Sequence, residues 1–89
     1  NEWLEVEWFK PQTFNKVVIQ EASDNILNYK LQYLKNGTWK DLANRTNCGV
    51  NRVHNFEGVT ASKCRVLIIE SKDKPTISEL KVFNDKTSN

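Results

Sequence analysis

The sequence predicts an all-β fold, an antiparallel sandwich built from short strands. Segments rich in β-branched and aromatic residues recur at short intervals along the 89 residues, and turn-forming residues separate them. Asn36-Gly37 lies between two such segments and is typical of a two-residue hairpin turn. The length suits one domain, over residues 1–89, with a modest core.

The strands are expected in order along the chain. Alternation of apolar and polar residues over Trp3–Phe9 indicates a half-buried strand, which Pro11 is expected to interrupt. Ile26–Leu34 also fits a helical face, but the hairpin signal that follows and its aromatic residues favour a strand. The other expected strands are Phe14–Gln20, Tyr29–Tyr33, Trp39–Ala43, Arg52–Phe56, Cys64–Glu70 (the most apolar, expected at the centre of a sheet) and Ile77–Phe83, with residues 85–89 as a fraying tail.

Composition and charge exclude several classes of function. The net charge is +2 and the basic residues are scattered, so nothing forms the basic stripe of a nucleic-acid-binding protein. The longest apolar run, Val66–Ile69, is far too short to span a membrane. The first residues do not resemble a signal peptide, and the chain contains no Met, so we interpret it as a mature or trimmed product.

The two cysteines, Cys48 and Cys64, leave two alternatives open. They are either buried thiols or one disulfide, which would contribute about 3 kcal/mol to stability in the chain-entropy model. Two glycosylation sequons begin at Asn36 and Asn44 and favour the secretory pathway. We therefore expect a secreted glycoprotein, in which a Cys48–Cys64 bridge and two free thiols stay equal alternatives.

No residue pattern indicates catalysis. His54 is the only histidine, it lies beside no nucleophile turn, and one His with two Cys does not make a typical zinc site. Glu5 and Glu7 have the spacing of a solvated strand face rather than of a glycosidase pair. The polar segments 20–28 and 70–76 instead suit a non-catalytic binding module, because amides, carboxylates and cationic groups can bind sugar hydroxyls.

Four blocks of sequence carry a resemblance to a known family: "WLEVEWFKPQTFNKVVIQEA", "YKLQYLKNGTWKDLA", "NRVHNFEGVTASKCRVLIIES" and "PTISELKVF". In this order they resemble the discoidin domain, also called the coagulation-factor (F5/8) type C domain or family 32 carbohydrate-binding module. Within that group the chain looks most similar to the C-terminal domain of family 29 α-L-fucosidases. The resemblance implies a jelly-roll β-sandwich in which Tyr29 and Trp39 are core residues and the hairpin is scaffold.

The chain departs from the family pattern at its N-terminus. Family domains begin earlier, with an opening strand and an Asp-Gly loop, so the resemblance implies a domain truncated there. Glu79 matches a position that often helps to hold a structural calcium, which is the one cofactor that the resemblance implies. The family's sugar site often pairs an Arg with an Asn after the "VVIQEA" strand, but that loop has no Arg here, and the loop Lys72–Pro75 has no aromatic ring.

The predicted function is therefore non-catalytic, lectin-like binding of galactose- or fucose-type glycans at loop tips. The predicted ligand-binding residues are Asp24, Asn25, Asn28, Arg52, His54 and Lys72. The alternatives are a protein-interaction or assembly domain, or a support domain cut from an α-L-fucosidase-like enzyme. The expected partners are glycans, without nucleic acid or membrane insertion. An open strand edge left by the truncation would favour a homodimer or association with a larger chain.

Overall fold

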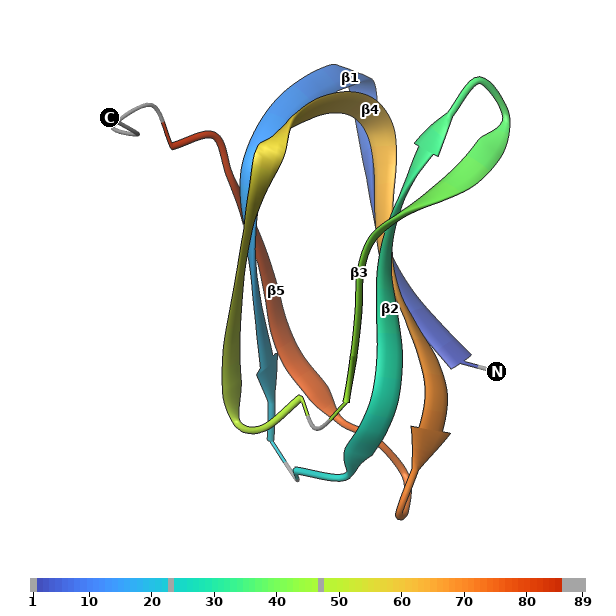
Figure 1. Ribbon diagram of the computed structural model, residues 1–89, viewed down its shortest axis with the longest axis vertical. Helices are drawn as coiled ribbons and strands as arrows, with labels where there is room; N and C mark the ends of the chain where they lie inside the picture. Colours follow the sequence, from blue (N-terminus) through green and yellow to red (C-terminus); the bar gives the residue numbers. More distant parts are fainter. Residues whose placement is uncertain (1, 23, 47, 86–89) are drawn as a thin grey trace.

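In the computed structural model, five strands form one continuous antiparallel sheet in the order β3-β2-β4-β1-β5 (Figure 1). The structure describes residues 2–22, 24–46 and 48–85. The strands are β1 (Glu2–Glu21), β2 (Ile26–Lys35), β3 (Thr38–Thr46), β4 (Asn51–Ser71) and β5 (Ile77–Phe83). The described residues form no helix that could cross a membrane. The all-β prediction is confirmed, and the helical alternative over Ile26–Leu34 is wrong.

The sheet becomes a sandwich because β1 and β4 fold over together at their middle, as the arch in Figure 1 shows. The first half of β1 and the second half of β4 lie in one layer with β2 and β3, and the other halves lie in a second layer with β5. The predicted break at Pro11 is therefore a bend within one strand. Likewise, the segments Arg52–Phe56 and Cys64–Glu70 are two halves of β4 rather than separate strands.

Two bulges near this bend explain its sharpness. The pairing moves from Glu7 opposite Lys63 to Gln12 opposite Ala61, so a stretch of β1 that contains Pro11 has no regular partner. Proline has no N–H to donate to a sheet, and an unpaired stretch is where it costs least. A second register shift follows Phe14. Extra residues on one strand kink and twist a pair, which turns the sheet back on itself.

The hairpin between β2 and β3 confirms the prediction made from Asn36-Gly37. Lys35 pairs with Thr38 across a two-residue turn, and Asn36 and Gly37 have φ of 53° and 79°. This left-handed backbone is what a type I′ turn requires, and Asn and Gly tolerate it best. The sequon residues Asn36 and Asn44 are both exposed, so their side chains are accessible.

The core lies between the two layers. Its largest fully buried side chains are Tyr29 and Phe14, which come from β2 and β1 and so join the layers. Phe14 also packs within the bend against Trp8, at 5.5 Å between ring centroids, and against Phe56, at 6.0 Å. Burial of an aromatic side chain contributes about 2–3 kcal/mol, so this aromatic cluster stabilises the bend as well as the core.

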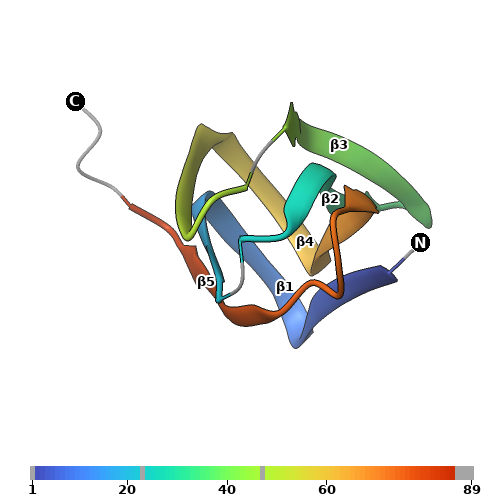
Figure 2. The same ribbon diagram turned by 90° about the horizontal axis from the view of Figure 1, so that it is seen from below.

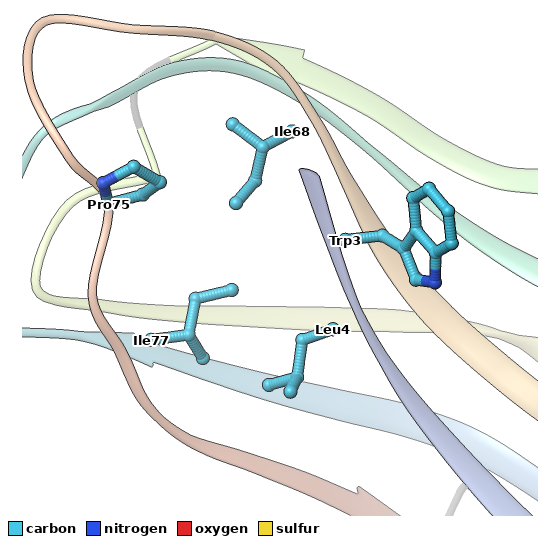
Figure 3. A pocket seen from close by; sticks show the side chains of 5 residues that line it. All are labelled: Trp3, Leu4, Ile68, Pro75 and Ile77. Atoms are coloured by element: carbon cyan, nitrogen blue, oxygen red, sulfur yellow. The ribbon is translucent and has the colours of Figure 1, made fainter. Parts of the chain in front are cut away.

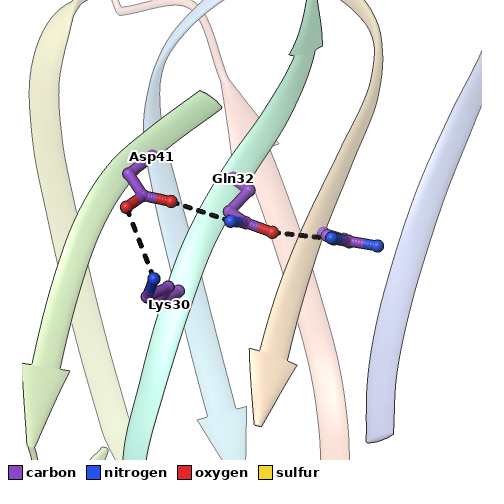
Figure 4. Close-up of polar contacts among 4 residues, drawn as sticks. Lys30, Gln32 and Asp41 are labelled. Carbon is purple, nitrogen blue, oxygen red and sulfur yellow. Dashed lines mark hydrogen bonds and ion pairs between the residues drawn. The ribbon is translucent and has the colours of Figure 1, made fainter. Parts of the chain in front are cut away.

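The outer face of the four-strand layer carries an ordered polar network (Figure 4). Arg65 Nε donates to Gln32 Oε1 at 2.8 Å, Gln32 Nε2 donates to Asp41 Oδ1 at 2.7 Å, and Lys30 Nζ lies 3.7 Å from Asp41 Oδ2. The Arg65 guanidinium also stacks 3.9 Å from the centroid of the Trp39 ring. Trp39 is thus a half-buried residue of this outer face, and its predicted place in the core is wrong, whereas the prediction for Tyr29 is confirmed.

Candidate binding site at the loop end

Three connections meet at the end of the sandwich opposite the bend: β1 to β2, β3 to β4, and β4 to β5 (Figure 1; Figure 2 views the molecule from this end). Backbone hydrogen bonds join them. Ala22 N donates to Thr76 O at 2.8 Å, and Lys72 N donates to Asn25 O at 2.8 Å. Cys48 N donates to Ile26 O at 3.3 Å. The backbones of these loops are therefore held to one another.

Glu21 is the central brace of this end. Its side chain is fully buried, its Oε1 accepts the backbone N–H of Asn25 at 2.6 Å, and its Oε2 accepts the backbone N–H of Thr76 at 3.2 Å. Hydrogen bonds to an ionised carboxylate are about twice as strong as neutral ones, so this side chain ties two loops together. Glu21 was not predicted from the sequence, although an acidic residue two positions after the β-branched run Val17–Ile19 was a signal for it.

Asn25 and Asp24 have different roles in the first loop. The Asn25 side-chain amide donates to Lys74 O at 3.1 Å, so this predicted ligand residue links the loop to the one before β5. Asp24 is exposed, and its φ of 54° is the left-handed conformation that Asp tolerates better than most residues. Its carboxylate is accessible to a ligand, whereas the Asn25 side chain is a structural link.

A second polar pair lies beside this loop. Asn28 Nδ2 donates to Glu70 Oε1 at 2.6 Å, across the pairing of β2 with β4. Glu70 is exposed and makes no other polar contact among the described residues, so its carboxylate can also accept a ligand hydroxyl. Lys72, two residues further on, is exposed as well. Within segment 70–76, Lys72 was predicted from the sequence as a ligand residue, and Glu70 was not.

His54 does not face a ligand. It is 5 % exposed and lies in the core, where its Nε2 is 2.8 Å from the Tyr29 hydroxyl. Burial, followed by the positive charges of Arg52 and Arg45, lowers the pKa of His54 to about 4, so the ring is neutral near pH 7. Burial likewise raises the pKa of Tyr29 to about 12. The prediction that His54 binds ligand is therefore wrong, because its side chain is buried in the core.

Arg52 is a second residue of this segment that was predicted to bind ligand. It is half-buried near the start of β4, opposite Ile19 of β1, and so belongs to the loop end of the sandwich. Its positive charge acts to lower the pKa values of three buried groups, Tyr29, Cys48 and His54. The structure thus brings Asp24, Asn25, Asn28, Arg52 and Lys72 to one end of the sandwich.

The two cysteines are free and buried, so the predicted bridge is wrong and the buried-thiol alternative is confirmed. Both lie beside β2, but at positions far apart along it. The backbone N–H of Cys48 donates to Ile26 O near the start of β2, whereas Cys64 of β4 pairs with Tyr33 near its end. Seven residues of strand put roughly 20 Å between these positions, whereas a disulfide needs Cα atoms within about 7 Å. Burial raises the pKa of Cys48 to about 11 and that of Cys64 to about 12.

Glu79, the predicted calcium ligand, is exposed on β5, and its Oε1 lies 3.8 Å from Lys81 Nζ. In the part of the chain that the structure describes, no three His, Cys, Asp or Glu side chains are grouped to hold a metal ion. Calcium takes six to eight oxygen ligands, and one carboxylate paired with a lysine falls well short of that number. The described residues therefore do not fit a calcium site by themselves.

Solved structures similar to this chain include both enzymes and single modules. A putative α-L-fucosidase from Bacteroides thetaiotaomicron matches with 28% identity and a TM-score of 0.89, over 94% of this chain and 20% of that chain. A family 29 fucosidase from Ruminococcus gnavus, solved with fucose, matches with 26% identity and a TM-score of 0.83, over 96% of this chain and 18% of that chain. This chain thus spans about a fifth of the fucosidases that it matches.

Among single modules, CpGH89CBM32-5 from Clostridium perfringens, solved with GalNAc-β-1,3-galactose, has a TM-score of 0.77 at 19% identity, over 91% of this chain and 64% of that chain. No curated protein sequence matches the chain. The model of the F5/8 type C domain, in contrast, matches residues 1–80, which is nearly the whole described sandwich. The chain therefore belongs to the F5/8 type C, or discoidin, domain family.

Proposed function

We propose that this domain is a non-catalytic glycan-binding module that holds its ligand at the loop end. The observation that carries this proposal is the cluster formed by Asp24, Asn28, Glu70 and Lys72, which come from two segments of the chain joined by the backbone bond of Lys72 to Asn25 and the side-chain bond of Asn28 to Glu70. A sugar hydroxyl both donates and accepts hydrogen bonds, so neighbouring carboxylate, amide and ammonium groups suit it.

The comparisons support a sugar as the ligand class. The Clostridium module was solved with a disaccharide that contains galactose, and the Ruminococcus fucosidase was solved with fucose. We propose galactose- or fucose-type glycans for the present chain on this basis. Because the cluster has no exposed aromatic ring among its named members, the binding energy would come mainly from hydrogen bonds, and a single site would be weak.

A glycan array, read first with calcium and then with a chelator, tests the proposal. We expect selective binding to galactosylated or fucosylated glycans, and loss with the chelator would reveal a calcium requirement. Asn28→Ala and Lys72→Ala should each weaken binding by about tenfold, which corresponds to about 1.4 kcal/mol. Their matched controls, Asn55→Ala and Lys40→Ala, alter exposed residues of the same types elsewhere and should leave affinity unchanged.

Thermal unfolding of the same variants separates ligand residues from structural ones. The midpoint should stay nearly constant for Lys72→Ala, because Lys72 is exposed and its side chain makes no polar contact with the other residues that the structure describes. A folded protein that binds no glycan would refute the proposal. So would equal losses of affinity in the variants and in their controls.

A second candidate function, support of a larger fucosidase-like enzyme, is favoured by one observation. The fucosidase structures contain this fold as about a fifth of a longer chain, and they match at higher identity than the Clostridium module does. Under this alternative the domain would bind a catalytic domain tightly and no glycan. Free galactose or fucose should release the domain from its target only if the glycan-binding proposal is correct.

We further propose an extracellular location, with Asn36 and Asn44 as glycosylation sites in a host that carries out this modification. Both asparagines are exposed, but only Asn36, in the β2–β3 turn, lies away from the loop end, whereas Asn44 pairs with Lys30 close to the end of β3. A glycan on Asn36 would leave the proposed binding site open, and one on Asn44 would lie near it. Intact mass before and after enzymatic deglycosylation measures the occupancy of each sequon, and an unchanged mass in such a host would contradict this part.

A further inference from the structure

The turn between β2 and β3 places a nucleophile next to an electrophile. The backbone nitrogen of Gly37 directly follows Asn36, whose side-chain amide carbon, Cγ, it can attack to close a five-membered ring. Two groups held in one molecule react far faster than the same groups free in solution. Asn36 is the only asparagine of the sequence that is followed by glycine, and glycine has no Cβ to crowd the attack.

Neither reacting group is held by another contact. Asn36 is exposed, and its side-chain amide makes no polar contact with the other residues that the structure describes. In a two-residue hairpin the flanking residues, here Lys35 and Thr38, form the closing pair, and the Gly37 N–H lies outside the ladder. The space around Gly37 is open, since a Cβ added there would meet nothing within 4 Å. Water and hydroxide can therefore reach both groups.

The turn has to open locally before the ring can close. A planar five-membered imide holds ψ of Asn36 far from the positive ψ that a type I′ turn requires. Opening is cheap at this place, because Lys35, Asn36, Gly37 and Thr38 are all exposed. Exposed tips open with free energies near zero, well below that of global unfolding.

The body of the hairpin stays paired while the turn opens. Trp39 lies beneath the Arg65 guanidinium, 3.9 Å from the ring centroid, and Gln32 Nε2 donates to Asp41 Oδ1 at 2.7 Å (Figure 4). These contacts join β3 to β2 and β4 directly behind the turn, so the opening does not extend past them. The reaction thus requires a local opening only.

We propose that Asn36 is a site of spontaneous covalent modification, namely deamidation through a succinimide. A base in solution takes the proton of the Gly37 N–H, and the nitrogen attacks Asn36 Cγ. A C–N bond forms, the Cγ–Nδ2 bond breaks, and ammonia leaves with the proton. Water then opens the imide at Cγ to give aspartate, or at the main-chain carbonyl to give isoaspartate. One water is consumed and one ammonia is released, without oxidant or reductant.

The two products differ in their effect on the hairpin. Aspartate tolerates the left-handed backbone of this position, where φ is 53°, so the turn survives. Isoaspartate carries the main chain through its own side-chain carbons, which adds one carbon to a turn of two residues. The type I′ geometry is then lost, and the closing pair of Lys35 with Thr38 should separate.

Deamidation and the glycosylation proposed above exclude each other at Asn36. Both use the same nitrogen, Nδ2, which a glycan would occupy and which deamidation removes. This exclusion rests on the proposed glycosylation, whereas the deamidation itself does not. A chain made in a host that attaches no glycan carries Asn36 in its reactive form.

Other features of the domain lie far from this turn. An apolar pocket of about 140 Å³ between the layers is lined by Trp3, Leu4, Ile68, Pro75 and Ile77 (Figure 3). Its Ile68 pairs with Tyr29, which is six residues from Lys35 along β2, or roughly 20 Å. The loop end is farther still. A modification of the turn should therefore leave the pocket and the loop end unchanged.

Ageing of the unglycosylated protein tests the proposal. Samples are kept at pH 6 and at pH 8, folded and in urea, and are then mapped by peptide mass spectrometry, with isoaspartate detected by enzymatic methylation. Asn44 is the matched control, because it is exposed and begins the other sequon but is followed by Arg45. In the folded protein Asn36 should react at least about tenfold faster than Asn44, which corresponds to about 1.4 kcal/mol in activation free energy. The reaction should be faster at pH 8, because the Gly37 nitrogen must lose its proton.

Two variants and hydrogen exchange locate the effect. Asn36→Gln should remove the signal, since its ring would have six members and closes more slowly. Asn36→Asp should keep the thermal midpoint of the unmodified protein. The isoaspartate fraction should exchange faster at the amides of Lys35 and Thr38 and at an unchanged rate at Ile68.

Three outcomes would overturn the proposal. The first is an equal rate at Asn36 and Asn44. The second is reaction of Asn36 in urea but not in the folded protein, which would show that the turn does not open locally. The third is an aged protein that contains no isoaspartate, which would exclude the succinimide.

Discussion

Acidification from pH 7 to pH 5 should destabilise this domain through one side chain, His54. The pKa of this buried ring is lowered from 6.5 to about 4, so in this interval the unfolded chain binds a proton that the folded chain excludes. Stability is therefore fully present above pH 6.5 and is lost as the pH falls toward 4. The physical cause is desolvation in the core beside Tyr29, reinforced by the positive charges of Arg52 and Arg45.

The magnitude follows from the two pKa values. One pKa unit corresponds to 1.36 kcal/mol, so the full shift from 6.5 to about 4 is worth about 3 kcal/mol, of which about 2 kcal/mol is lost by pH 5. For a domain of this size, a loss of 2 kcal/mol lowers the midpoint of thermal unfolding by roughly 10 °C.

Urea unfolding between pH 7 and pH 4.5, at constant ionic strength, measures this loss. His54→Gln is the matched variant, because glutamine does not titrate and retains a polar group that can reach the Tyr29 hydroxyl. Carboxylates titrate equally in both proteins, so the difference between their plots of unfolding free energy against pH gives the contribution of His54. Parallel pH profiles for the two proteins, or an NMR titration of His54 with a midpoint near 6.5, would refute the buried, neutral histidine.

Three further predictions concern the supports of the fold. Glu21→Gln should lower the free energy of unfolding by about 1–3 kcal/mol, because an amide N–H₂ would face the N–H of Thr76 or of Asn25. Hydrogen exchange at these two backbone amides should accelerate, and unchanged exchange would contradict the bracing role of Glu21. Arg65→Lys should cost about 1 kcal/mol in urea unfolding, since an ammonium cannot keep both the stacking on Trp39 and the bond to Gln32, and an unaltered midpoint would rule this out. Gly37→Ala should cost about 1 kcal/mol, because φ is 79° there; a more stable variant would argue against the turn type.

The parts of the fold that were predictable from the sequence have local causes. The hairpin depends on two residues that tolerate positive φ, and the limits of β5 are those predicted from the pattern of Ile77–Phe83. Placement of polar residues near strand ends likewise indicated a loop-end site, and Asp24, Asn28 and Lys72 do lie at that end. Alternation and turn chemistry act over a few residues, so one sequence is enough to detect them.

The remaining features depend on contacts between residues far apart in the chain. From the sequence alone, Pro11 indicates the end of a strand. In the structure β1 pairs with β4 on both sides of Pro11, and the strand bends there because β1 has more residues than β4 between the paired positions. The polar surroundings of His54 in the sequence suggest exposure, whereas packing between the layers buries it against Tyr29.

The sequence by itself determined the all-β class, the hairpin and the polar end of the sandwich, because strand period and turn conformation are encoded by neighbouring residues. Only the tertiary structure decided that Cys48 and Cys64 lie too far apart to bridge, that Glu21 braces the loops, and that Trp39 faces outward under Arg65. Burial and partners of a side chain are set by which strands become neighbours and which face each presents. These relations arise from the fold as a whole.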